Sequence, residues 1–537
     1  MKKESVINHL KRLFIRQSVT EATIIITLLG LFSRFLGFLR EMMIAAFFGA
    51  KKFTDAYVVS NALPNILAGL VAGALSSVFI PLYAEWKEKY GKEESEKFVS
   101  ILLSTIFIIL LLVTIISYIL SPIIIYILAP GFNLETKNLA INLSYIMLPG
   151  IIFWGTYGIL TGLYNAHRSF IIPNLAGVLG NLIFILSIFV LHKYLGVYIL
   201  AWGTLANVIF QYILLLPYLS KIGFSLRWEI DPKYPGMKKA LILITPIFLG
   251  QSIGLINMAV DRIFGSFLPE GGISALNYAS RLYQLPFNLF INALATAMYT
   301  EFAFSAQNEN LDLLKTSMEK SIRAVLFLII PATFGFIFLG KPIVELAFQR
   351  GLFDAYATKR TSESLIFYSL GLPFMSINTI IVRVFFSLHD TKTPVVNSVI
   401  ALISNIILNT LFIKPLAHMG LALATSCASI ISTLLLINSI KQKISDPFGK
   451  DLKEKIKLFT IWGIFISILA LFIYKGLYLI LPKNQIGLAI SLLSAVGFSA
   501  LIYFILGLKY QIEESKKIFS IIKKNLNYLS QLIGFKI

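Results

Sequence analysis

The sequence predicts an all-α polytopic membrane protein with fourteen transmembrane helices, and three observations lead to this fold class. First, 57% of the 537 residues are hydrophobic and only 14% are charged, which gives a mean hydropathy of +0.79. Second, apolar runs of membrane-spanning length recur along the whole chain, since a bilayer core takes about 20 helical residues. Third, short sequence features recur at an offset near 221 residues.

The fourteen predicted helices follow one another with short connections. Because their number is even, both termini are expected on the same side of the membrane. Most of the 47 Lys and Arg residues lie in the termini and loops on that side, which the positive-inside rule places in the cytoplasm. The expected limits are about 22–49, 54–84, 98–128, 138–165, 171–191, 197–219, 237–267, 271–303, 322–340, 358–388, 394–414, 419–440, 457–479 and 485–508.

The recurring features divide the predicted helices into two copies. Leu63-Pro64-Asn65 in the second span corresponds to Leu285-Pro286 in the eighth, and Leu200-Ala201 in the sixth corresponds to Leu421-Ala422 in the twelfth. Six spans per copy make the repeats parallel, as in transporters that rock two halves around a central cavity. We therefore expect a basic amphipathic N-terminus at 1–21, an N-lobe at 22–219, a C-lobe at 220–440, two extra helices at 441–508 and a basic amphipathic cytoplasmic tail at 509–537.

A charged residue inside the first predicted span is the first indication of a functional site. Arg34 lies near the middle of this span, and Gly30, Gly37 and Glu41 share its helix face at helical spacing. An ionisable side chain at that depth costs about 2.5 kcal/mol or more unless it faces a wet cavity or a partner. The alternative is that Arg34 pairs internally and only orients the helix.

Arginines outnumber acids within the predicted spans of both expected lobes. Arginine offers the bidentate geometry that suits phosphate, so an anionic or phosphorylated substrate is expected in a shared cationic cavity. The eighth span also carries a polar stripe that a lipid-facing helix would not tolerate. The arginines are Arg34, Arg40, Arg262, Arg281 and Arg383, the acids include Glu41, Asp55 and Asp261, and the stripe is Asn277, Arg281, Gln284, Asn288 and Asn292.

Signatures of enzymes are not found. The sequence has no phosphate-binding loop of the GxxxxGK[ST] type and no HExxH motif, and it contains a single cysteine, Cys427. We therefore expect no covalent chemistry, no metal and no cofactor. In a membrane protein, the excess of basic residues is explained by the loops and termini on the cytoplasmic side, so no nucleic-acid partner is expected. The basic, amphipathic start of the chain argues against a cleavable signal peptide.

Several motifs in a fixed order identify a resemblance to a known family. They are SRFLGFLRE at 33–41, Thr54-Asp55-Ala56-Tyr57, Ser280-Arg281-Leu282, FQRGLFD at 348–354 and LHDTKTP at 388–394. With them the chain resembles the MurJ/MviN family of lipid II flippases, in the multidrug/oligosaccharidyl-lipid/polysaccharide exporter superfamily. The resemblance runs from about residue 22 to 440. It implies two six-helix lobes around a cationic cavity, a groove for a polyprenyl tail on the last two helices, and functional positions at Ser33, Arg34, Arg40, Asp55 and Arg281.

Two departures from the family pattern concern the expected cavity. Where many members carry a basic pair and a Glu-Gly in the second span, this chain has the uncharged stretch Ala68–Gly73. Ser280 stands where an acid usually precedes the arginine of the eighth span, and Arg262 adds a cation that is not general to the family. We therefore expect a cationic cavity whose positive charges lie partly at other positions than in the family. This leaves the identity of the lipid-linked substrate open.

The expected function is flipping of lipid II, the undecaprenyl-pyrophosphate-linked peptidoglycan precursor, from the inner to the outer leaflet by alternating access. We expect a monomer in the cytoplasmic (inner) membrane, in contact with membrane lipids and near cell-wall synthesis enzymes. The expected gating residues are Asp55 and Glu41. The expected substrate-binding residues are Ser33, Arg34, Arg40, Arg262, Asn277, Arg281 and Gln284.

Three alternatives stay open at the level of sequence. A flippase for another polyprenyl-pyrophosphate-linked glycan would use the same cationic cavity. A cation-coupled drug exporter of the same superfamily would carry more unpaired acids than arginines in its cavity, which is the opposite of the balance here. A scaffold that recruits cell-wall enzymes would have no need of the polar stripe from Asn277 to Asn292.

Overall fold

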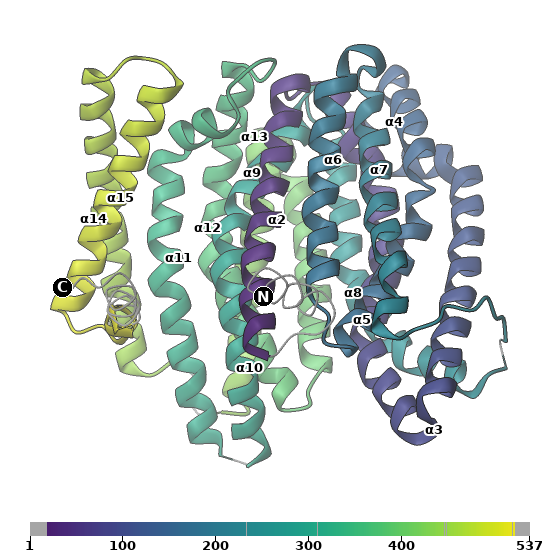
Figure 1. Cartoon of the computed structure of the whole chain (residues 1–537). Coiled ribbons are helices and arrows are strands. Elements are labelled where there is room, and N and C mark those ends of the chain that lie inside the picture. Colours follow the sequence, from purple (N-terminus) through teal and green to yellow (C-terminus); the bar gives the residue numbers. More distant parts are fainter. Residues whose placement is uncertain are drawn as a thin grey trace, which may run out of the picture. The chain divides into compact units, whose positions relative to one another are not determined.

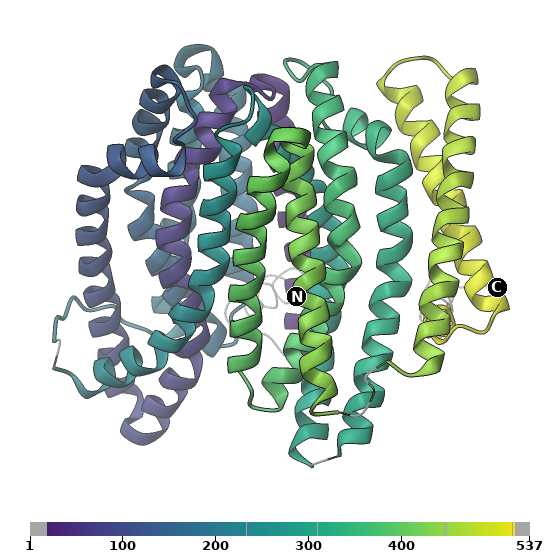
Figure 2. The same ribbon diagram turned by 180° about the vertical axis from the view of Figure 1, so that it is seen from behind.

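The structure, a computed structural model, consists of helices joined by short connections (Figures 1 and 2). It describes residues 19–520, except positions 232, 309, 445, 447 and 518. The all-α membrane fold class is confirmed. Within the described residues, eight helices are long and apolar enough to cross a membrane, or ten if each of two bent pairs forms one span. The number fourteen stays a prediction, and most of the expected N-terminal segment 1–21 and tail 509–537 lies outside the described residues.

The observed helices begin and end close to the expected spans. They are α2 (Val19–Phe48), α3 (Lys52–Leu128), α4 (Leu134–Met147), α5 (Gly150–Ala166), α6 (Ile171–Leu195), α7 (Tyr198–Leu215), α8 (Pro235–Gly265), α9 (Gly272–Pro286), α10 (Asn292–Gln307), α11 (Leu311–Phe348), α12 (Ala355–Ser387), α13 (Lys392–Lys441), α14 (Lys450–Ile480) and α15 (Gln485–Lys509), with short helical turns η1 (Leu216–Tyr218), η2 (Ser220–Ile222) and η3 (Phe287–Ile291).

Two of these helices each hold two of the expected spans. Helix α3 has 77 residues, and at 1.5 Å per residue it is several times longer than a bilayer core is thick. Its backbone breaks at Gly91, with φ 82°, between the expected second and third spans. Helix α13 breaks in the same way at Ala417, between the expected eleventh and twelfth spans. At these two positions, where the sequence predicted loops, the helical conformation is therefore interrupted at a single residue.

Proline interrupts the helix that carries the polar stripe. Helix α9 ends at Pro286, and a π-helical turn, η3, leads from there into α10. Proline has no N–H for the helical ladder, and π-turns inside helices often accompany functional sites. The helix type therefore changes over the five residues that follow Pro286.

The chain forms two compact units. The first contains residues up to Ser274 together with Arg350–Asp354, and the second contains the remainder. Helix α8 packs against α3 in the first unit, although the sequence repeat assigns it to the second copy. The lobe boundary at residue 220 rests on that repeat and stays a prediction.

Equivalent positions of the repeat make equivalent local bonds within their own units. The hydroxyl of Thr204 donates to the carbonyl of Leu200 at 2.7 Å, and that of Thr425 donates to the carbonyl of Leu421 at 3.1 Å. Both threonines satisfy their hydroxyl inside the helix, as such residues do in apolar surroundings. The same bond is made by other helical threonines, such as Thr410 and Thr460, so it does not test the repeat, which stays a prediction.

Candidate functional site

A buried carboxylate stands at the start of α9. Asp55 belongs to the first turn of α3 and is 3% exposed. Its Oδ2 accepts from the N–H of Gly271 at 2.6 Å, and its Oδ1 accepts from the N–H and the hydroxyl of Ser274 at 2.7 and 2.6 Å. The first N–H groups of a helix have no partner within it, and a negative charge there is favourable. Asp55 therefore caps the N-terminus of α9, and its expected gating role stays a prediction.

Close backbone approaches surround this cap within the first unit. Gly271 has φ +81°, and a Cβ atom there would lie 2.0 Å from the carbonyl oxygen of Ala50. Gly351, in the FQRGLFD motif, has φ +58°, and its Cβ would lie 2.2 Å from the carbonyl oxygen of Ala46. The N–H of Leu352 donates to that same carbonyl at 2.8 Å. Only glycine fits at these two positions without strain.

The predicted cation Arg40 is held between α2 and α6. One guanidinium nitrogen donates to the Oδ1 of Asn181 at 3.3 Å, another lies 3.3 Å from the Glu41 carboxylate, and the group lies 5.2 Å from the ring centre of Phe184. Asn181 also donates to the carbonyl of Ser33 at 3.4 Å. The Nε of Arg40 is buried and has no hydrogen-bond partner among the described residues. Arg40 is thus positioned with one donor still to be satisfied.

The other predicted site residues are distributed over both units. Arg34 is exposed on α2, and Arg262 is half-buried in the last turn of α8, both in the first unit. The α9 residues Asn277, Arg281 and Gln284 belong to the second unit, with Arg281 exposed and the two others half-buried. The structure brings Ser33, Arg40, Glu41 and Asn181 together. A cavity shared by both groups of arginines stays a prediction.

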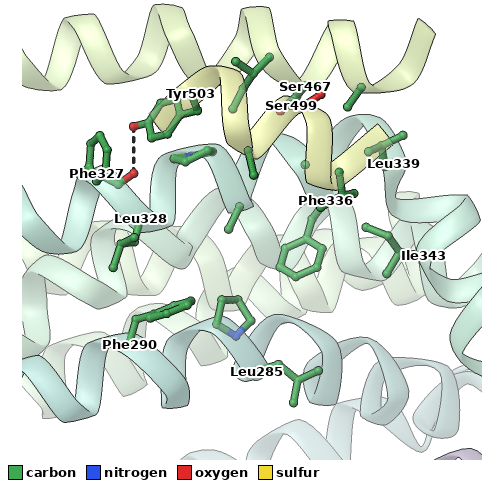
Figure 3. A pocket seen from close by; sticks show the side chains of 18 of the residues that line it. Leu285, Phe290, Phe327, Leu328, Phe336, Leu339, Ile343, Ser467, Ser499 and Tyr503 are labelled. Atoms are coloured by element: carbon green, nitrogen blue, oxygen red, sulfur yellow. Dashed lines mark hydrogen bonds between the residues drawn. The ribbon is translucent and has the colours of Figure 1, made fainter. Parts of the chain in front are cut away.

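An apolar cavity of about 660 Å³ lies in the second unit (Figure 3). Leu285 and Phe290 contribute from the α9 and η3 region, while α11, α14 and α15 supply the rest of its lining. Among the described residues that line it, only Ser467, Ser499 and Tyr503 have polar side chains. Its size falls within the range of small-molecule sites in proteins.

One side of the cavity is fixed by a hydrogen bond that a proline makes possible. Pro331 lacks an N–H, so it cannot donate to the carbonyl of Phe327 one helical turn earlier. The hydroxyl of Tyr503 donates to this carbonyl instead, at 2.9 Å, and so joins α15 to α11 (Figure 3). Both side chains are buried. The bond removes a polar group from an otherwise apolar wall.

Sequence reasoning missed several of these residues. Asn181 is a polar residue inside an expected span, so the rule that selected Arg34 would have found it. The partners of Asp55, Gly271 and Ser274, gave no signal because the first acts through its backbone. The cavity lining consists of ordinary apolar residues, and only the family resemblance indicated the two helices α14 and α15.

The fold and these features define a class. Apolar helices of membrane length, arginines placed within them and a ligand-sized apolar cavity are those of a multi-pass membrane transporter. The family model described as "Lipid II flippase MurJ" matches residues 44–475. The chain therefore belongs to the MurJ family.

Individual relatives agree with this assignment. The "Probable lipid II flippase MurJ" of Buchnera aphidicola subsp. Schizaphis graminum is 31% identical over 503 residues, which cover 91% of this chain and 96% of the relative. The "Lipid II flippase MurJ" of Thermosipho africanus is 33% identical over 447 residues, 83% of this chain and 91% of the relative.

Solved structures show the same fold. The structure titled "Lipid II flippase MurJ, inward closed conformation" is 30% identical and superposes with a TM-score of 0.76, covering 91% of this chain and 99% of the other. A MATE family transporter titled as inward-facing has a TM-score of 0.65 over 78% of this chain and 96% of its own, at 17% identity. Because the sequence identity is only 17%, the similarity to the MATE family transporter concerns the fold alone.

Proposed function

We propose that this protein flips lipid II from the inner to the outer leaflet of the cytoplasmic membrane by alternating access. Membership of the MurJ family supports the substrate class, and the distribution of polar and apolar features supports the transport of a lipid with a charged headgroup. The protein works as a monomer with both termini in the cytoplasm, and no covalent step is involved.

The pyrophosphate is bound by arginines. Arg40 is held by Asn181 and Glu41, and its side chain is 24% exposed, so an anion can reach a guanidinium that is already positioned. Arg34 is exposed on α2, six residues or about 1.7 helical turns before Arg40. Arginine forms two parallel bonds with phosphate oxygens, which adds orientation to charge attraction. Within the same unit, Arg262 contributes further positive charge and Ser33 adds a hydrogen bond to the headgroup.

The polyprenyl tail is bound in the apolar cavity of the second unit. This cavity is the observation that carries the proposal, because α14 and α15, which lie outside the six-helix repeat, form part of its wall. A branched hydrocarbon chain suits a cavity whose described lining residues are apolar apart from Ser467, Ser499 and Tyr503.

Alternating access requires that the substrate binds the two states differently, since a ligand shifts an equilibrium only by its differential affinity. Asp55 and Glu41 are the proposed gating residues. The bonds that Asp55 makes to Gly271 and Ser274 would have to be kept or exchanged during the transition. Occupation of Arg40 by pyrophosphate would compete with its contact to Glu41.

The test is a lipid II flipping assay in reconstituted vesicles with two glycine variants. A Cβ at Gly335, which lines the cavity, would meet no atom within 4 Å, so Gly335→Leu fills the cavity without a backbone clash. Gly497 on α15 is equally open but does not line the cavity, which makes Gly497→Leu the matched control. We expect flipping to fall at least tenfold in the first variant only. Equal activity of both would refute tail binding in this cavity.

A second experiment separates lipid II from other polyprenyl-pyrophosphate-linked glycans. Expression in a strain depleted of its peptidoglycan flippase restores growth only if lipid II is a substrate. Failure of a well-expressed, membrane-inserted protein to restore growth would favour another lipid-linked glycan.

A further inference from the structure

The segment between η2 and α8 lies extended along the second half of α3. The N–H of Arg227 donates to the hydroxyl of Ser100 at 3.2 Å, and the N–H of Glu229 donates to that of Ser104 at 3.3 Å. Two residues of extended chain span about 6.6 Å, and four residues of helix rise about 6 Å, so the two repeats match. The segment therefore follows the helix axis rather than leaving it as a solvated loop.

Both ends of this segment are anchored near Phe98. Next to the buried Phe224, the hydroxyl of Ser225 donates to the carboxylate of Glu96 at 3.2 Å, two residues before Phe98. At the other end, a Cβ on Gly236 would lie 2.5 Å from the Phe98 ring, and the hydroxyl of Tyr234 accepts from the Trp86 indole at 3.1 Å. Both ends of the segment therefore contact α3 at about the same position along its axis.

Between these anchors the segment extends to Phe107. The Trp228 ring meets the Phe107 ring edge-on with centroids 5.4 Å apart. Phe107 lies nine residues beyond Phe98, which is about 13 Å along the helix. Phe98 begins the expected third span, so Trp228 lies beside a part of α3 that the bilayer should surround. Figures 1 and 2 show the segment at the edge of the ribbon, next to α3.

Every second side chain of the segment, starting at Leu226, is apolar and exposed. Leu226, Trp228 and Ile230 alternate along it and are 46%, 64% and 52% exposed. On α3, Ile109 and Leu112 are exposed as well. Tryptophan is enriched at the interface between headgroups and acyl chains. Water is therefore an unfavourable surrounding for this row of side chains.

The flanking charges suit an anionic membrane surface. Between residues 221 and 238, the exposed charged side chains are those of Lys221, Arg227, Lys233 and Lys238, against the single exposed acid Asp231. Juxtamembrane basic residues are attracted to anionic lipids of the cytoplasmic leaflet. The row of apolar side chains and the basic residues around it thus both favour contact with an anionic membrane.

We propose that residues 224–231 form a re-entrant membrane anchor, with Leu226, Trp228 and Ile230 inserted at the boundary between headgroups and acyl chains. The partner is the lipid leaflet on the side of this segment. The buried hydroxyls of Ser100 and Ser104 satisfy backbone N–H groups that would otherwise lie unpaired in lipid. The anchor does not depend on which lipid the protein transports.

The test is tryptophan quenching in nanodiscs that contain anionic phospholipid. Subtracting the fluorescence of Trp228→Phe from that of the wild type gives the emission of Trp228. Subtracting that of Trp86→Phe gives the emission of Trp86, a tryptophan buried in protein, which serves as the control. Phospholipids brominated at shallow or deep acyl positions report contact with lipid, and aqueous iodide reports contact with water.

We expect shallow bromine to remove more than half of the Trp228 emission, deep bromine to remove less, and iodide to have little effect. Quenching by iodide alone, quenching by neither agent, or stronger quenching by deep bromine would overturn the proposal. In the double variant Ser100→Ala/Ser104→Ala, which keeps every apolar side chain, Trp228 should become more accessible to iodide. Unchanged accessibility would show that the two hydroxyls do not hold the segment in the membrane.

Discussion

The surroundings of Asp55 in the first unit and the apolar cavity in the second unit differ in how closely they are packed and in how far their polar groups are hydrogen-bonded. Around Asp55, the carboxylate accepts hydrogen bonds from the buried residues Gly271 and Ser274, and the nearby backbones touch so closely that only glycine fits. Around the apolar cavity, open space lies next to Gly335, and the hydroxyl of Ser499 has no hydrogen-bond partner among the described residues. The first region is closed by its own contacts, whereas the second has room for a ligand.

This difference separates positions that maintain the fold from positions that take substrate. Substitutions in the closed region should lower stability, and transport would fall as a consequence. Substitutions that fill the cavity should lower transport and leave stability unchanged. Stability and transport measurements on variants of each region test this separation.

The largest effect is expected for Asp55→Ala. The substitution leaves the N–H groups of Gly271 and Ser274 buried without an acceptor, and each lost bond to a charged group is worth about 1.5–3 kcal/mol. Thermal unfolding of the purified protein should show a loss of stability of about 3 kcal/mol or more. Ser274→Ala removes a single hydroxyl and is the matched control, with an expected loss of about 1 kcal/mol. Similar unfolding temperatures for the two variants would contradict the capping role.

Gly271→Ala tests the same region through its backbone. A methyl group would lie 2.0 Å from the carbonyl of Ala50, at a φ of +81° that alanine avoids. We expect a loss of about 2 kcal/mol or more from this strain. Gly254→Ala on α8 is the control, because its Cβ meets no atom within 4 Å and alanine favours the helix. If Gly271→Ala is as stable as the control, the close contact is not real.

Tyr503→Phe tests the wall of the cavity rather than its space. The variant keeps the ring but leaves the carbonyl of Phe327 without its donor, which Pro331 cannot replace. A lost buried hydrogen bond of this kind costs about 1–2 kcal/mol in unfolding free energy. Tyr510→Phe removes an exposed hydroxyl on the same chain segment and should have no effect. Equal stability of both variants would show that the bond does not hold α15 to α11.

The smallest effect is expected for Asp390, which lies between α12 and α13 in the LHDTKTP motif. Burial opposes ionisation of its carboxyl, but bonds from the N–H and hydroxyl of Thr393 and from Lys443 outweigh this and lower its pKa to about 2. A lowered pKa contributes stability that is present above the ordinary value near 3.8 and is lost as the pH falls toward 2.

Unfolding scans of Asp390→Asn and the wild type should therefore differ by a constant amount between pH 5 and pH 8 and converge below about pH 4. A difference that changes between pH 6 and pH 8 would mean that another group titrates with Asp390.

The sequence predicted the helices well, because long apolar runs leave few alternatives in a bilayer. It also predicted which residues are unusual, since Arg34, Arg40 and Asp55 interrupt such runs. It could not show that Asp55 binds backbone N–H groups of Gly271 and Ser274, because that bond depends on how the chain returns to α3. The cavity was invisible for another reason: its lining residues have the composition of any lipid-facing or core helix.

The most direct test of the account is binding of purified protein to lipid II and to an analogue with a short polyprenyl tail, compared between Gly335→Leu and Gly497→Leu. The wild type and Gly497→Leu should prefer the full-length tail, while Gly335→Leu should bind both lipids with the same, weaker affinity. Such a result would assign the cavity of the second unit to the tail. A Gly335→Leu protein that keeps the preference for the long tail would contradict this assignment.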